Sequence, residues 1–206
     1  MGMVRAAVAE IAVGSHPAVD TAHIAIIGHS FGALLAVNCA GADSNVVPTA
    51  NARMLAMPAC VGCPNPINEL TAISPMTDIL VVVAEEDRVG GDVMARQIWV
   101  RLDRIPLHRR DYITILSDSH GKPPLIADHE LPATAPFAGA PGALDALDWY
   151  GLWRPFDALV PCSRTGQECT TALGDTPERR FMGRWSDGVP VTELKVESGG
   201  PNDEAD

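Results

Sequence analysis

The sequence predicts an α/β fold in which a parallel sheet carries helices on both faces. Short apolar segments rich in isoleucine and valine alternate along the chain with helix-forming segments. The clearest strand, 78–84, has five consecutive apolar residues after Asp78, three of them valine. Because strands separated by helices usually pair in parallel and are buried on both faces, this order of segments predicts the architecture.

The predicted elements follow one another from the N-terminus to about residue 160. Strands are expected at 23–28, 52–58, 78–84 and 111–116, and helices at 4–13, 30–40, 90–102 and 143–160. Asp92 is the expected N-cap of the third helix. The chain therefore divides into a partial domain at 1–162 and a polar, turn-rich extension at 163–206 that packs on it and ends in a disordered acidic tail.

The composition limits the classes of function. The 206 residues are 47% hydrophobic and 20% charged, which is enough apolar material for the core of one globular domain. The formal net charge of −11 repels phosphate backbones and anionic lipids, so neither nucleic acid nor a membrane surface is an expected partner. No apolar run approaches the roughly 20 residues of a transmembrane helix, and no signal peptide is visible.

Four of the five cysteines form two close pairs, Cys60 with Cys63 and Cys162 with Cys169. Each pair could form a short-loop disulfide, which is typical of an oxidising compartment, or remain as free thiols. A disulfide between Cys162 and Cys169 would close an eight-residue loop. Zinc usually needs further Cys or His ligands at short spacing, and neither pair has them, so no metal site is expected.

One segment, IAIIGHSFGALLAV, runs from a buried strand through a serine directly into a helix. Its corner consists of Gly28, His29, Ser30, Phe31 and Gly32. A tight turn that happens to contain serine is one interpretation. The other is a nucleophile elbow, in which small flanking residues let strand and helix approach closely around a strained serine. The helix would then direct its N-terminal dipole and the Phe31 N–H toward an oxyanion formed at Ser30.

A catalytic serine needs a base, and the base needs an acid that orients it. Asp87 lies three residues after the strand 78–84, at a strand exit where parallel sheets gather functional loops. Glu86 is the alternative acid. His120 follows the strand 111–116 by a few residues and is the expected base.

The other histidines are weaker candidates for the base. His129 lies nine residues beyond His120, further into the loop, where we expect it to be held less firmly. His29 adjoins the serine, but neighbouring side chains on such a turn point apart, so it is expected to pack or to line the pocket.

The motifs GHSFG, ILVVVAEED and SDSHG, in that order, resemble the catalytic half of an α/β-hydrolase from about residue 20 to about residue 160. The likeness is greatest to the lipase- and cutinase-like serine esterases. It implies that Ser30 is the nucleophile, Asp87 the acid and His120 the base of a catalytic triad. It also implies that Phe31 is an oxyanion donor and that no cofactor takes part.

The sequence departs from this family before the elbow. Only 22 residues precede His23, which leaves no room for the strands and the second oxyanion loop of a complete hydrolase. We therefore expect few strands before the elbow and an open sheet edge that favours self-association.

Two functions remain open. The first is a serine hydrolase that cleaves small-molecule or polymer esters through an acyl-enzyme. The second is a catalytically impaired fragment or non-catalytic remnant of such an enzyme. The resemblance and the paired cysteines favour a secreted or periplasmic location.

Overall fold

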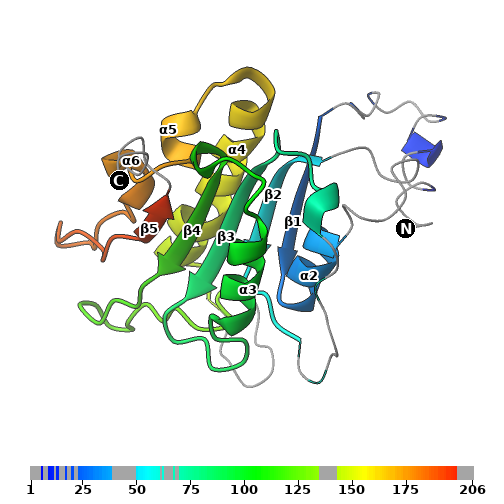
Figure 1. The fold of residues 1–206 in the computed structure, drawn as a ribbon. Coiled ribbons are helices and arrows are strands. Elements are labelled where there is room, and N and C mark those ends of the chain that lie inside the picture. The colour runs from blue at the N-terminus through cyan, green and yellow to red at the C-terminus, as the bar shows by residue number, and fades with distance from the viewer. Residues whose placement is uncertain are drawn as a thin grey trace, which may run out of the picture.

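The computed structural model describes residues 23–38, 50–60, 70–134 and 143–198, together with isolated positions before 23 and at 62 and 67. This part of the chain is an α/β fold built on a five-stranded sheet (Figure 1). In sheet order the strands are β1 (Ile24–His29), β2 (Ala50–Ala56), β3 (Asp78–Ala84), β4 (Arg110–Ile115) and β5 (Lys195–Ser198). Strands β1 to β4 are parallel, and β5 is antiparallel to β4. The predicted α/β class with a mainly parallel sheet is confirmed.

Helices cover both faces of this sheet (Figure 1). They are α2 (Phe31–Asn38), α3 (Val93–Arg101), a π-helical segment η3 (Leu147–Trp153), α4 (Arg154–Thr165), α5 (Cys169–Ala172) and α6 (Pro177–Arg180), with short 3₁₀ turns η1 (Leu70–Ala72) and η2 (Leu107–Arg109). Strand β3 is buried along its whole length. Its Ile79 and Val81 pack with α2 and α3, whereas Leu80 and Val82 pack with η3 and α4. This alternation is the physical reason for its continuous apolar run.

Several predicted details differ from the structure. The helix expected at 143–160 begins as the π-helical η3, continues as α4 and ends before Gly166, whose φ of 73° is left-handed. Asp92 occupies the N-cap position of α3 but makes no capping hydrogen bond, and its carboxylate instead lies 3.7 Å from Arg96. The helix expected at 4–13 falls largely outside the described residues, as do Cys39, Cys63 and the acidic tail.

The part of the extension that the structure describes packs on the same core as the sheet. A disulfide joins Cys162 at the end of α4 to Cys169 at the start of α5, with the two Cα atoms 4.8 Å apart. Cys60 is disulfide-bonded as well. Met182 and Val191 are buried in the core between the sheet and α4. Strand β5 was not predicted, because four residues with alternating exposure carry little apolar signal.

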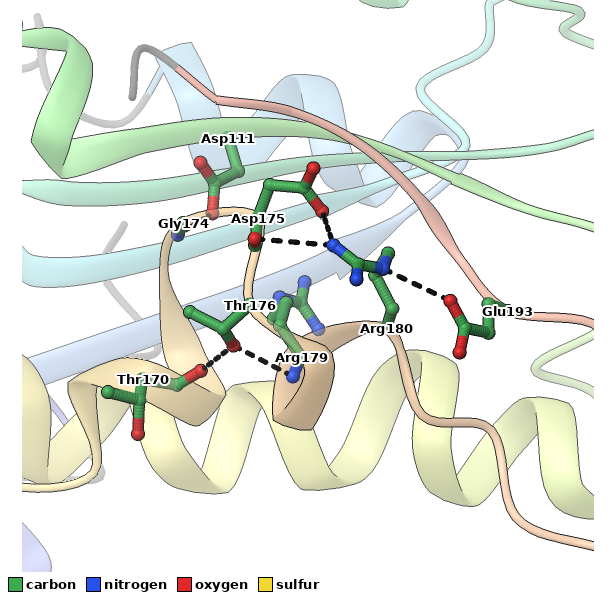
Figure 2. Close-up of polar contacts among 8 residues, drawn as sticks. All are labelled: Asp111, Thr170, Gly174, Asp175, Thr176, Arg179, Arg180 and Glu193. Atoms are coloured by element: carbon green, nitrogen blue, oxygen red, sulfur yellow. Dashed lines mark hydrogen bonds and ion pairs between the residues drawn. The ribbon is translucent and has the colours of Figure 1, made fainter. Parts of the chain in front are cut away.

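Polar contacts fix the turns of the extension (Figure 2). Thr176 caps α6 by accepting a hydrogen bond from the backbone N–H of Arg179 at 3.0 Å. Arg180 pairs with both Asp175 and Glu193, at 2.6 and 3.1 Å. The contact with Glu193 connects α6 to the segment that leads into β5. None of the helices in the described ranges has the length and apolar character needed to span a bilayer.

Candidate functional site

The carboxyl ends of β1 to β4 lie at one edge of the sheet, and the candidate site forms there (Figure 1). Strand β1 ends at His29 and α2 begins at Phe31, so Ser30 alone makes the turn. Ser30 has a φ of 55°, in the left-handed region that side chains other than glycine rarely adopt. Its backbone N–H donates to the carbonyl of Ala56 at the end of β2, at 3.0 Å. The surrounding backbone therefore holds the serine in a strained conformation.

The two glycines that flank this turn are not equivalent. A Cβ on Gly28 would lie 2.2 Å from the carbonyl oxygen of Gly32, so strand and helix approach too closely for any side chain there. A Cβ on Gly32 would have no atom within 4 Å. Only the first glycine of the motif is required by packing.

Asp87 lies in the turn after β3 with its side chain fully buried. Its Oδ1 accepts backbone N–H groups of Val89 and Gly90, both at 2.8 Å, and its Oδ2 lies 2.9 Å from His129 Nδ1. Burial raises the pKa of this carboxyl, but the hydrogen bonds from His129, Gly90 and Val89 outweigh burial and lower the pKa below its ordinary value. Asp87 is therefore an anion at neutral pH. The rival acid, Glu86, points its side chain to solvent.

His129 connects this carboxylate to the serine. Its Nδ1 lies 2.9 Å from Asp87 Oδ2, and its Nε2 lies 2.9 Å from Ser30 Oγ. A carboxylate only accepts, so Nδ1 carries the hydrogen and Nε2 is left to accept from the serine hydroxyl. This arrangement lets the imidazole take the proton of Ser30 while Asp87 stabilises the resulting imidazolium.

His120, the base expected from the sequence, does not lie beside Ser30, and the histidine that the structure places there is His129. The Nε2 of His120 is 2.7 Å from Asp187 Oδ2, and its ring packs on Trp185 with 5.8 Å between centroids. An antiparallel bridge between Asp118 and Leu125 makes 119–124 an outward excursion of the loop. His120 lies on that excursion, whereas the chain returns to the sheet edge only after the bridge.

The returning segment is held by hydrogen bonds to two other turns and to the start of its own loop, so His129 is more firmly fixed than its distance from β4 indicates. The carbonyl of Ala127 accepts the backbone N–H of Glu86 at 2.8 Å, and the N–H of Ala127 donates to Ser117 Oγ at 2.9 Å. His29 Nε2 lies 2.9 Å from the carbonyl oxygen of His129. Strand order indicates which loop carries the base but not which histidine, because these contacts join residues far apart in sequence.

The remaining features of the site concern the space around it. Phe31 is the first residue of α2, where backbone N–H groups have no intrahelical partner. A hollow of about 280 Å³ adjoins His129, and Val89 and Ile126 form part of its lining. Within the described ranges, no group of three or more His, Cys, Asp or Glu side chains is arranged to hold a metal ion.

Neither a protein-family model nor a curated protein matches this chain. The site is therefore assigned from its geometry and chemistry alone.

Proposed function

We propose that this protein is a serine hydrolase of the α/β-hydrolase type that cleaves carboxylic esters. The observation that carries the proposal is the hydrogen-bonded chain from Ser30 through His129 to Asp87. Its links join residues that are 99 and 42 positions apart, and its three members follow three different strands. A buried carboxylate, an imidazole and a hydroxyl on a strained turn form the arrangement that activates serine in unrelated hydrolases.

In the proposed reaction, Ser30 Oγ attacks the carbonyl carbon of the ester while His129 Nε2 takes the hydroxyl proton. The carbonyl oxygen becomes an oxyanion, which the Phe31 N–H and the dipole of α2 stabilise. Collapse of the intermediate breaks the bond to the alcohol oxygen, which leaves with the proton from His129. Water then attacks the acyl-serine by the same route and releases the carboxylic acid.

Exposed apolar side chains beside the site are the basis for proposing an ester with an apolar acyl or alcohol part. Val89 and Ile126 line the hollow beside His129 and are 55% and 43% exposed. The remaining lining is charged or titratable: Glu86, Arg88, Asp128, His129 and Glu130. Phe31, beside the serine, is 52% exposed. Exposed apolar side chains near a reacting serine gain most by covering themselves with apolar substrate.

Hydrolysis of p-nitrophenyl butyrate tests the proposal. The parent chain should release p-nitrophenol catalytically, and Ser30→Ala should abolish this activity without loss of the folded state. Ser119→Ala, which changes an exposed serine, is the matched control and should behave as the parent. A parent chain without turnover would favour the non-catalytic remnant, and an active Ser30→Ala variant would refute the site.

A further inference from the structure

His29 lies between the turn that carries Ser30 and the loop that carries His129. Its Nε2 is 2.9 Å from the carbonyl oxygen of His129, and the two imidazole rings lie 4.8 Å apart between centroids, tilted by 45°. A carbonyl oxygen only accepts, so His29 Nε2 carries the hydrogen. The residue before the nucleophile therefore donates a hydrogen bond to the backbone of the residue that would act as the base.

This contact is placed where it affects the imidazole of His129 most directly. Both ring nitrogens of His129 are engaged, one by Ser30 and the other by Asp87. The ring can satisfy both only if its own backbone is correctly located, and a displacement of about 1 Å can cost on the order of 100-fold in rate. A second backbone contact of this segment is made two residues earlier, where the carbonyl of Ala127 accepts the N–H of Glu86.

The charge state of His29 suits this position. Burial lowers the pKa of His29, and the neighbouring His129 lowers it further, although Glu130 and Asp87 oppose the shift. His29 is therefore neutral at neutral pH. When His129 accepts the proton of Ser30, the new imidazolium has the neutral ring of His29 beside it. A protonated His29 would repel that cation.

We infer that His29 is a positioning residue for the proposed hydrolase: its Nε2–H holds the carbonyl of His129 and so fixes the imidazole between Ser30 and Asp87. This inference rests on the proposed function. His29, the second residue of the GHSFG motif, would then do more than pack or line the pocket.

Three substitutions separate the hydrogen bond from packing. His29→Leu fills similar space without a donor, His29→Ala removes both, and His29→Gln retains an amide N–H that can reach the same carbonyl. We expect kcat for p-nitrophenyl butyrate to fall about 10- to 100-fold in His29→Leu and His29→Ala, with KM changed less than about threefold. His29→Gln should recover most of the lost kcat.

A proton NMR signal gives a readout that does not depend on turnover. The Nδ1–H that His129 donates to Asp87 should resonate far downfield in the parent and in His29→Gln, and should broaden or disappear in the two variants without a donor. Thermal unfolding of each variant shows whether it is folded. A parent that is folded but inactive would refute the proposed function and leave this NMR comparison to decide the inference. An active parent with unchanged kcat and an unchanged downfield signal in His29→Leu would overturn the inference alone, as would equal losses in His29→Gln and His29→Leu.

Discussion

Two histidines of the loop after β4 each lie within hydrogen-bond distance of an aspartate from another part of the chain, and the two pairs differ in burial and in their further partners. His129 and Asp87 are 2.9 Å apart, with 7% and 0% of their side chains exposed. His120 and Asp187 are 2.7 Å apart, with 42% and 54% exposed. The buried pair has a third partner in Ser30, whereas the exposed pair joins the outward excursion of the loop to Asp187 of the extension.

A histidine–aspartate contact alone therefore does not mark a functional site. Water screens an exposed ion pair, so such a pair contributes little to the free energy of unfolding, with a median of about 0–1 kcal/mol. Enclosure strengthens each electrostatic contact, and a third group gives the imidazole a proton to move. We therefore propose that the buried pair takes part in chemistry. The exposed pair attaches the loop after β4 to the C-terminal extension.

Removing each histidine in turn should give the largest contrast. We expect His129→Ala to lower kcat/KM for p-nitrophenyl butyrate by roughly 10⁴-fold or more, because the members of such a site act as a unit. His120→Ala should change kcat/KM less than about threefold, because it breaks only an exposed pair. The reverse result would exchange the two roles.

Replacing each aspartate by asparagine should sharpen the same contrast. Asp87→Asn preserves shape but removes the charge that orients His129, and we expect a loss in kcat of about 10⁴-fold or somewhat less. Asp187→Asn should leave kcat close to the parent value. Steady-state kinetics on both variants would refute the comparison if the two losses were similar.

The two glycines of the elbow differ in the same way, because Gly28 is confined by neighbouring backbone and Gly32 faces open space. Gly28→Ala should destabilise the chain by about 1–3 kcal/mol, because its Cβ would overlap the backbone of Gly32. Gly32→Ala meets open space and should be neutral or stabilise by about 0.5–1 kcal/mol. Urea unfolding of both variants measures this difference, and equal stabilities would contradict the tight turn.

A further prediction concerns a buried carboxyl, Asp148, whose Oδ2 accepts the backbone N–H of Asp145 while its other oxygen is unpartnered within the described part of the chain. Burial raises the pKa of Asp148 to about 6. An unfolded aspartate titrates near 3.9, so this group stabilises the fold fully below about pH 4 and loses that contribution as pH rises through 6. Asp148→Asn should reduce the fall in unfolding free energy between pH 4.5 and 7. The exposed Asp187→Asn should leave that fall intact, and equal pH profiles for Asp148→Asn and the parent would refute the assignment.

Much of the fold was accessible from the sequence, because it depends on local patterns. The apolar run of β3 and the junction between strand and helix at Ser30 are both visible in stretches of adjacent apolar residues. The position of Asp87 at the candidate site was also accessible, because this residue lies in a short turn directly after its strand. The histidine that contacts Ser30 was not, since the loop after β4 contains two histidines and contacts with residues distant in sequence decide between them. The antiparallel strand β5 was missed for a related reason, because its pairing with β4 is specified by the partner strand and hardly by its own residues.

Covalent labelling by a fluorophosphonate, mapped by mass spectrometry of the digested protein, tests whether His129 activates Ser30. We expect an adduct on the peptide that contains Ser30 in the parent chain, formed at a similar rate in His120→Ala. In His129→Ala the labelling should be slowed by several orders of magnitude, because no base remains to take the serine proton. An unlabelled Ser30 in the folded parent, or labelling that survives loss of His129 and vanishes with His120, would contradict this role of His129.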